Sequence, residues 1–545
     1  MSYEFDYLVL GGGSAGCAVA SRLTEDPNTR VAIIEAGTQG DNWLVTAPAA
    51  LVLMVPRKMN NWAFETTPQK ALNNRVGYQP RGKALGGSSA INAMVYVRGH
   101  RTDYDHWAEL GNKGWAFNDV LPYFKKSENN YSFSNQWHGN NGPLPVNKLR
   151  SDNPIQAVYL DAARQAGFKI NEDFNAEEQE GVGIYQVTQK DGERWSAARA
   201  YITPFLGKRD NLRIELSANI QRILFEGKRA VGVEFIQEGT LRTLRARKEI
   251  ILSAGTFQSP QLLMLSGIGD GNELQKLGIE TIQHLPGVGK NLQDHPDFIF
   301  GYKSKSLDLL GLSMSGSVRL IKEIFRYRNE RRGMITSNFA EGGGFLKTRP
   351  ELVAPDIQLH FVTALVEDHA RKLNLGHGFS CHVCLLRPKS RGFVGLASAD
   401  PNQPPIIDPN FLGNEEDLND LVEGFKLTRR LMDAPALAKL RTQDIFTAHV
   451  KTDDDIRAVL RERVDTVYHP VGSCKMGVDA MAVVDPHLRV YGVEGLRVVD
   501  ASIMPTIIGG NTNAAAIMIG EKAADMIMND AKPQPSLQPE VALSM

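Results

Sequence analysis

The sequence predicts an α/β protein: a mainly parallel sheet with helices on its faces, joined to an α+β domain built on a second sheet. A short apolar run, residues 5–10, leads into the glycine-rich turn GGGSAG and then into the helix-forming segment CAVASRL. Much later in the chain, DIQLHFVTAL and FSCHVCLLRP alternate as strands do and are followed by turn residues. A chain of 545 residues is long enough for two or more domains with a large buried core.

The first turn has the pattern of a Rossmann-like dinucleotide site. Gly11 permits a tight turn, Gly13 lets the backbone approach a pyrophosphate, and Gly16 lets the helix pack on the strand. The N-terminus of that helix offers free N–H groups and a partial positive charge to phosphates. A second strand, RVAIIEAG, carries Glu35, whose carboxylate suits an adenosine ribose. The alternative is a plain glycine-rich turn with a surface glutamate, and this unit alone does not distinguish NAD from FAD.

Further motifs indicate a flavin. GKALGGSSAIN (residues 82–92) is rich in small residues, whose backbone can lie against a planar ring or a phosphate. With the residues that follow, this stretch resembles the first signature of the glucose–methanol–choline (GMC) flavoprotein oxidoreductases, and GTFQSPQLLMLSGIG (residues 255–269) matches the second. LPGVGKNLQDH and HPVGSCKMG are also family-like, so the resemblance covers nearly the whole chain. Within the family the chain is most similar to bacterial FAD-linked alcohol dehydrogenases, with choline and polyethylene glycol dehydrogenases as near neighbours.

The resemblance implies FAD and assigns positions to it. The ADP half would be held by Gly11, Gly13, Ser14, Ala15, Gly16, Glu35 and Ala36, and the adenine would meet the backbone of Ile220. The flavin would be bordered by Gly87, Ser88, Asn92, Ala93, Met94 and Val95, with Asn511 and Thr512 at its polar edge and Asp500 and Ala501 near the pyrophosphate or ribityl chain. Asp500 also ends an apolar strand, LRVVD, where open α/β sheets place ligands. Some relatives bind the flavin covalently through a histidine at the position of Ile91, so we expect non-covalent FAD here.

An alcohol loses hydride from carbon only as its hydroxyl loses a proton, so the protein must supply a base. Of twelve histidines, His469 lies in the family-like segment YHPVGSCKMG and matches the catalytic histidine of the family. Asn511 matches the catalytic partner, although an N-cap of the helix that follows is a second role for it. Asn513 is the alternative for either role. Tyr468 and Val467 are expected to line the substrate pocket because they are adjacent to the base.

The motifs divide the chain into two expected domains. The FAD-binding domain takes residues 1–154, 195–300 and 465–530, the last part with the catalytic histidine and asparagine; the substrate domain takes residues 155–194 and 301–464, and residues 531–545 form a surface tail. Helical periodicity over residues 416–432 predicts a helix on the outer side of the substrate sheet.

Composition excludes several classes of partner. Sixty-one basic against sixty-two acidic residues leave no electrostatic footprint for nucleic acid. Four cysteines in so long a chain favour a reducing compartment over a disulfide framework. Cys381 and Cys384 fall three apart on an expected strand and point to opposite faces, so two packed thiols are expected there and no metal site. The sequence shows neither the pattern of a signal peptide nor a segment apolar enough to span a membrane. We therefore expect a cytoplasmic protein, with peripheral contact to the inner membrane as an alternative. The oligomeric state is left open.

The segment SVRLIKEIFRYRNERRG (residues 317–333) has two interpretations. It carries six basic and two acidic residues interleaved with apolar ones. One interpretation is a helix on a membrane surface, which would suit an enzyme passing electrons to a quinone. The favoured interpretation is an amphipathic surface helix with a solvated basic face.

The expected reaction is oxidation of a primary alcohol to an aldehyde, with electrons passed to a quinone. Medium-chain aliphatic or aromatic alcohols are favoured over choline and polyethylene glycol. Choline would need a carboxylate or an aromatic cage, in which Glu341 could take part unless it is structural. The alternatives are an alcohol or choline oxidase that uses oxygen, and the hydroxynitrile lyase and light-driven decarboxylase activities that relatives perform on the same scaffold.

Overall fold

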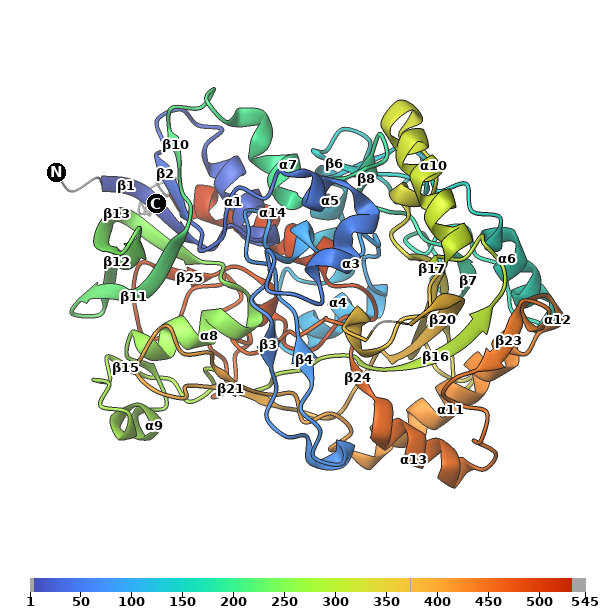
Figure 1. Ribbon diagram of the computed structural model, residues 1–545. Coiled ribbons are helices and arrows are strands. Elements are labelled where there is room, and N and C mark those ends of the chain that lie inside the picture. Colours follow the sequence, from blue (N-terminus) through green and yellow to red (C-terminus); the bar gives the residue numbers. More distant parts are fainter. Residues whose placement is uncertain (1–3, 373, 532–545) are drawn as a thin grey trace, which may run out of the picture.

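The computed structural model describes residues 4–372 and 374–531. Two large sheets form its framework and lie at opposite ends of the molecule in Figure 1, with the chain passing between them several times. The predicted tail, residues 531–545, lies almost entirely outside the described residues. Within the described ranges, none of the helices combines the length and apolar character needed to cross a membrane.

The first sheet has the strand order β10-β2-β1-β13-β12-β11, with β25 paired to β13. Strands β10, β2, β1, β13 and β25 run parallel, and β13 continues into an antiparallel meander with β12 and β11. The predicted strands around residues 5–10 and 31–34 are confirmed. The bounds are β1 Glu4–Leu10, β2 Val31–Ile34, β10 Leu212–Glu215, β11 Ala218–Glu226, β12 Arg229–Gln237, β13 Thr240–Leu252 and β25 Leu496–Val498.

Two helices join the ends of the chain on this sheet. α1 (Ser14–Leu23) packs against α14 (Asn513–Asp530), and a Cβ on Gly520 would lie 2.5 Å from the carbonyl oxygen of Ala15. Only glycine allows so close an approach of the two backbones. Arg22 binds both carboxylate oxygens of the buried Glu521, at 2.8 Å each, across the same contact. The last helix therefore holds the 500–512 segment beside the first glycine-rich turn.

The second sheet is antiparallel, in the order β23-β16-β20-β19-β18-β7, with β17 on β20 and β24 on β16. Its strands alternate as predicted: Leu359 and Phe361 pack into the core beneath α11 (Glu415–Met432), whereas His360 faces the other way, into a cavity. The predicted outer helix is confirmed. The bounds are β7 Gly181–Ile184, β16 Pro296–Ser304, β17 Gly311–Leu312, β18 Ala340–Leu346, β19 Ile357–Val362, β20 Gly376–Leu385, β23 Arg441–Asp444 and β24 Asp465–Thr466.

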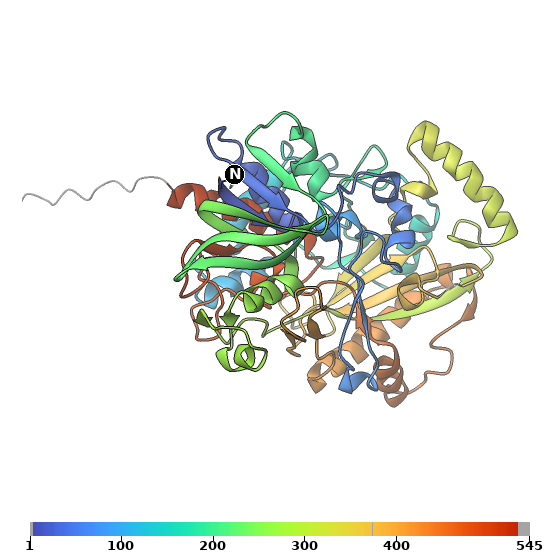
Figure 2. The same ribbon diagram turned by 60° about the vertical axis from the view of Figure 1, so that its left-hand side comes forward.

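The remaining elements cover the two sheets or connect them, and Figure 2 shows α10 as an outlying helix at one edge. The helices are α2 Trp43–Thr46, α3 Leu51–Met54, α4 Arg101–Glu109, α5 Phe117–Ser127, α6 Ile155–Gln165, α7 Ala197–Tyr201, α8 Gly255–Leu265, α9 Gly271–Lys276, α10 Met314–Glu330, α12 Pro435–Ala438 and α13 Asp453–Arg463. The short strands are β3 Phe64–Glu65, β4 Tyr78–Gln79, β5 Glu128–Asn130, β6 Leu144–Val146, β8 Gln189–Lys190, β9 Glu193–Arg194, β14 Ile268–Gly269, β15 Gln283–His284, β21 Phe393–Gly395 and β22 Ile406–Asp408.

The division into two domains stays a proposal. By strand pairing, residues 296–300 and 465–466 go with the second sheet, because they lie on β16 and β24. All four cysteines are buried free thiols. Cys381 packs into the core under α11 and Cys384 contacts Asp297 on the opposite face of β20, as the strand geometry predicts.

Candidate active site

One cavity of about 790 Å³ is lined by residues of both sheets, a volume typical of small-molecule and cofactor sites. It brings together segments from the beginning, middle and end of the chain. Of the predicted site residues, all but Gly16 line it: Gly11, Gly13, Ser14, Ala15, Glu35, Ala36, Gly87, Ser88, Asn92, Ala93, Met94, Val95, Ile220, Val467, Tyr468, His469, Asp500, Ala501, Asn511 and Thr512. Gly16 instead packs the helix on the turn, because its Cβ would lie 2.1 Å from the carbonyl oxygen of Gly11.

The first glycine-rich turn forms an open cradle at one end of the cavity. Gly11 has φ +104° and leaves 2.5 Å between its Cβ position and the carbonyl oxygen of Ser253, so no other residue fits there. The Cβ position of Gly13, in contrast, has no atom nearer than 3.8 Å and borders the cavity. Gly13 also caps α1 without a side-chain hydrogen bond, so the first N–H groups of the helix stay available to an anionic ligand. The cradle fits a pyrophosphate.

Glu35 follows β2 directly and is buried at this end of the cavity. Its carboxylate accepts hydrogen bonds from the backbone N–H of Gly12 at 2.9 Å and of Gly37 at 2.7 Å. Burial raises its pKa to about 7. A surface glutamate beside a plain turn is therefore not what the structure contains. Ile220, on β11, lines the same cavity, so the strand that was expected to meet an adenine lies on its wall.

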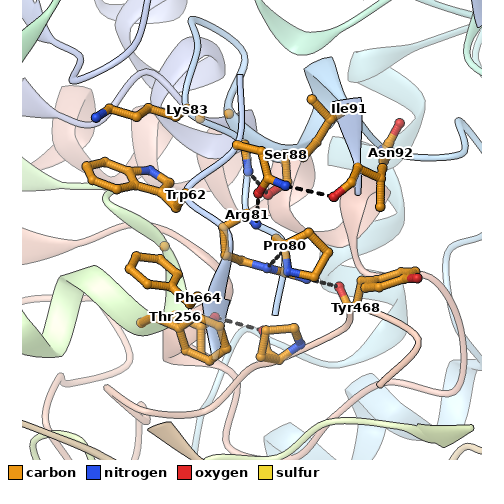
Figure 3. Close-up of a pocket in the computed structure, with 18 of the residues that line it drawn as sticks. Trp62, Phe64, Pro80, Arg81, Lys83, Ser88, Ile91, Asn92, Thr256 and Tyr468 are labelled. Carbon is orange, nitrogen blue, oxygen red and sulfur yellow. Dashed lines mark hydrogen bonds between the residues drawn. The ribbon is translucent and has the colours of Figure 1, made fainter. Parts of the chain in front are cut away.

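The second small-residue loop packs directly on the first. Gly87 has φ +53°, and a Cβ there would lie 2.8 Å from the Cα of Gly13. Figure 3 shows Ser88, Ile91 and Asn92 together on one wall of the pocket. The buried Arg194 fixes Asn92, donating to its backbone oxygen at 2.5 Å and to its Oδ1 at 2.9 Å. Burial lowers the pKa of Arg194 to about 9.

Asp500 ties the end of the parallel sheet to α8. Its carboxylate accepts from the backbone N–H of Gly255 at 2.9 Å, from Ser259 Oγ at 2.6 Å and from the backbone N–H of Ser502 at 2.8 Å. Asp500 stands two residues beyond β25 and lines the cavity, where the carboxyl ends of parallel strands lead.

His469 and Asn511 meet at another part of the cavity. Asn511 Nδ2 lies 3.1 Å from His469 Nε2 and 3.3 Å from His360 Nε2. Gln358 Nε2 donates to Asn511 Oδ1 at 2.9 Å, which assigns the amide orientation and turns Nδ2 toward the imidazoles. Asn513 is elsewhere engaged, because its Oδ1 accepts from Ser14 Oγ at 2.7 Å. The residue beside the histidine is therefore Asn511. The cap position of α14 falls on Thr512, without a side-chain hydrogen bond, so the expected N-cap role of Asn511 is wrong.

A chain of hydrogen bonds sets the tautomer of His469. His295 Nε2 lies 3.1 Å from the carbonyl oxygen of Leu386, which can only accept, so Nε2 carries the proton and Nδ1 of His295 is an acceptor. His469 Nδ1 lies 3.0 Å from that acceptor and must donate to it. The proton of neutral His469 is thereby placed on Nδ1. Its Nε2 carries no proton and accepts a hydrogen bond from Asn511 Nδ2 at 3.1 Å.

The three imidazoles are held neutral. Burial, the adjacent imidazoles of His295 and His360 and the Arg81 guanidinium lower the pKa of His469 well below 6.5. Burial lowers the pKa of His295 and of His360 to about 3 each. A neutral imidazole with a free nitrogen is the protonation state that a general base needs.

Asp294 binds the backbone N–H groups of both His295 and His469. Its Oδ1 accepts from the N–H of His295 at 2.9 Å and of His469 at 2.8 Å, and its Oδ2 accepts from Thr466 Oγ1 at 2.5 Å. Burial raises the pKa of Asp294 to about 7. Arg81, drawn in Figure 3 between Phe64 and Tyr468, donates from Nη2 to the carbonyl oxygen of Tyr468 at 2.9 Å.

Several members of the site were not singled out from the sequence: His295, Asp294, His360, Gln358, Arg81 and Arg194. The motif LPGVGKNLQDH carries the first two and was noted only as family-like. Gln358 and His360 stand two apart on β19 and so share a face, a signal that the alternating pattern of DIQLHFV contained.

Comparisons with known proteins identify the same family that the sequence motifs resemble. The family model described as GMC oxidoreductase matches residues 5–297 with its N-terminal part and residues 388–520 with its C-terminal part. Alcohol dehydrogenase [acceptor] of Pseudomonas putida is 46% identical over 528 residues, 96% of each chain. Mitochondrial choline dehydrogenase of Homo sapiens is 43% identical over 544 residues, 98% of this chain and 91% of that one. A formate oxidase variant from Aspergillus oryzae superposes with a TM-score of 0.90 at 29% identity, covering 97% of this chain and 99% of that chain. The chain belongs to the GMC oxidoreductase family.

Proposed function

We propose that the protein binds FAD non-covalently and oxidises a primary alcohol to an aldehyde. GMC oxidoreductases are FAD-binding enzymes, and the glycine cradle, the open N-terminus of α1 and the buried Glu35 fit the ADP half of that cofactor. The observation that carries the proposal is the contact between His469 Nε2 and Asn511 Nδ2 at 3.1 Å in the same cavity.

The chain's own residues supply the acid–base part of the reaction. FAD, when bound, provides the acceptor for the hydride that leaves the alcohol carbon. His469 takes the hydroxyl proton on Nε2, because its other nitrogen is already engaged with His295. In the structure Asn511 Nδ2 donates to His469 Nε2; when the alcohol binds between the two side chains, its oxygen takes over that N–H, which stabilises the charge that develops there. The burial of His469 keeps bulk water away from the base and strengthens these interactions.

Non-covalent binding is supported by the residue at the family's attachment position. Ile91 is buried against Val45, Met54, Ala84 and Ala90 and offers no nucleophile. Acid or heat denaturation followed by centrifugation should release all the flavin into the supernatant. Flavin that stays with the precipitated protein would contradict this part of the proposal.

The charges on the cavity wall support a neutral alcohol as the substrate. Glu35 and Asp500 are the carboxylates among its described lining residues, and both are bound to backbone N–H groups. Glu341 is buried away from the lining, bound to Ser337 Oγ at 2.6 Å and Gln156 Nε2 at 2.7 Å. Among the described residues that line the cavity, no carboxylate is thus left without backbone partners to balance a quaternary ammonium. Near the histidines the wall carries Phe339, Val362, Leu365 and Val366, which suit a neutral aliphatic or aromatic alcohol.

The electron acceptor we propose is a quinone. A curated relative over 96% of this chain is named Alcohol dehydrogenase [acceptor], whereas others, from Brucella species, are named oxygen-dependent choline dehydrogenases. Reduced enzyme mixed with a soluble quinone, and separately with air, would distinguish the two acceptors by the rate at which flavin absorbance returns.

The test of the reaction is anaerobic mixing of the FAD-loaded protein with octan-1-ol, benzyl alcohol or choline while flavin absorbance is recorded. We expect rapid bleaching with the neutral alcohols and slow bleaching or none with choline. Fast bleaching with choline alone would reverse the substrate assignment. No bleaching with any alcohol, together with release of cyanide from a cyanohydrin, would replace alcohol oxidation by the lyase activity.

A further inference from the structure

The exposed surface of α10 carries a row of large apolar side chains, in addition to the solvated basic residues that the favoured interpretation of its sequence expected. Met314 is 92% exposed, Val318 58%, Ile321 57% and Phe325 59%. Their spacing of four, three and four residues puts them in one row along the helix, the apolar stripe. Large apolar side chains that stand in a continuous exposed row mark an interaction site.

Ion pairs on the other side of the helix fix which face points outward. Arg326 pairs with Asp152 at 2.7 Å and Arg319 with Asp308 at 3.0 Å, while Glu323 accepts from the backbone N–H of Met334 at 2.7 Å. These contacts tie the polar side of α10 to the body of the protein. The apolar stripe therefore remains uncovered, as the outlying position of α10 in Figure 2 also indicates.

Two cations flank the apolar stripe. Lys322 and Arg328 are exposed, and neither forms an ion pair within the described part of the chain. The acidic residues of the helix are engaged elsewhere, since Glu323 binds the body and Glu330 lies 3.4 Å from Arg326. An apolar row with unpaired cations beside it has the character of a helix that lies in the interface of an anionic bilayer.

A neighbouring segment connects α10 with the cavity wall. The 3-10 helix η5 (Met334–Thr336) packs on α10 and also on η1 (Pro48–Ala50), which stands between α2 and α3. Trp43, the first residue of α2, is 65% exposed. Leu51 and Val52 of α3, which follows η1 directly, line the cavity.

We propose that the apolar stripe of α10 inserts into the surface of an anionic phospholipid bilayer. Met314, Val318, Ile321 and Phe325 enter the boundary between headgroups and acyl chains, and Lys322 and Arg328 meet lipid phosphates. A second copy of the chain fits this surface less well, because the carboxylates of its α10, Glu323 and Glu330, are already engaged and would leave Lys322 and Arg328 without partners. Docking would bring the η1–α3 side of the cavity close to the bilayer, from which an apolar alcohol or quinone could enter.

Sedimentation with vesicles tests the proposal without turnover, so its result is independent of the alcohol oxidation proposed above. The FAD-loaded full chain is mixed with phosphatidylcholine vesicles, and with vesicles that contain one third phosphatidylglycerol, at low and high salt. We expect the protein to pellet with the anionic vesicles at low salt. Lys322→Gln with Arg328→Gln should weaken partitioning roughly 30-fold, from about fivefold for each basic residue.

Ile321→Glu with Phe325→Glu removes the centre of the apolar stripe and should abolish pelleting. The matched control is Leu241→Glu with Val353→Glu, two residues of other elements that are 58% and 78% exposed; it should pellet as the unchanged protein does. All variants should reduce their flavin at the unchanged rate. Equal pelleting of the Ile321/Phe325 variant, or no pelleting of the unchanged protein, overturns the proposal. A lipid-free dimer that this variant converts to a monomer overturns it in favour of a second copy.

Discussion

Replacing His295 tests whether the protein sets the tautomer of its base. His295 Nδ1 accepts from His469 Nδ1 at 3.0 Å, and its Nε2 donates to the carbonyl oxygen of Leu386 at 3.1 Å. In His295→Leu, a side chain of similar volume fills the space but offers no acceptor. The proton of His469 then has no acceptor at Nδ1, and only the hydrogen bond that Nε2 accepts from Asn511 still favours this tautomer. The share of His469 with its proton on Nε2, which blocks the lone pair that the substrate hydroxyl needs, therefore rises.

The magnitude follows from the cost of a buried donor without a partner. That cost is roughly 1–3 kcal/mol, which corresponds to a roughly 5- to 150-fold lower population of the competent tautomer. The rate of anaerobic flavin reduction by a saturating alcohol should fall by this factor, with FAD content and melting temperature close to those of the unchanged protein.

His295→Asn separates positioning from packing. Asparagine is smaller than leucine, so a role in packing alone predicts the larger loss for asparagine. Its Oδ1 can accept from His469 Nδ1, so control of the tautomer predicts that asparagine keeps most of the rate that leucine loses. Flavin reduction that is unchanged in His295→Leu, or slower in His295→Asn than in His295→Leu, would refute the reasoning.

Four further predictions concern the same cavity. His469→Ala should slow flavin reduction by roughly 10²–10⁴-fold with FAD still bound; near-normal reduction in stopped flow would exclude it as the base. Asn511→Ala should slow reduction roughly 10- to 150-fold through loss of a hydrogen bond to a charged oxygen, whereas Asn513→Ala, which breaks only the contact with Ser14, should change FAD affinity more than the rate. Gly13→Val should fold normally, since φ is −77° and the Cβ position is open, yet lose FAD in equilibrium dialysis; an equal FAD content would contradict the cradle. The lowered pKa of His469 keeps its neutral form dominant as pH falls, so the reduction rate should stay level from pH 8 to below the ordinary value of 6.5; a tenfold loss per pH unit that begins at or above 6.5 would count against it.

The end of the cavity that contains the first glycine-rich turn and Glu35 could largely be predicted from the sequence, because its structure depends on residues that are close together in the chain. The order of strand, Gly11–Gly13–Gly16 turn and helix is written in neighbouring residues, and so is the strand that delivers Glu35. Backbone conformation and the exposure of helix N–H groups depend on those residues alone. The resemblance to the family also singled out His469 and Asn511, which the structure brings together in the cavity.

Other parts required the folded chain, because they depend on contacts between distant residues. Asn511 could be chosen over Asn513 only when Asn513 was seen to bind Ser14, 499 positions away. His295 lies 174 residues before His469, and no local pattern indicates that their Nδ1 atoms meet. For α10 the periodicity showed an apolar side and a basic side, but ion pairs with Asp152 and Asp308 determine which side faces solvent.

By itself, the sequence determined the fold class and the glycine-rich turn, since spacing and residue type suffice for these, and its resemblance to a family led to the prediction that His469 is the base. The tertiary structure alone decided the tautomer of His469, the partner at its Nε2 and the uncovered apolar stripe of α10. A hydrogen bond or an exposed face is fixed by which side chains come within a few ångströms of each other, and long-range packing sets those distances.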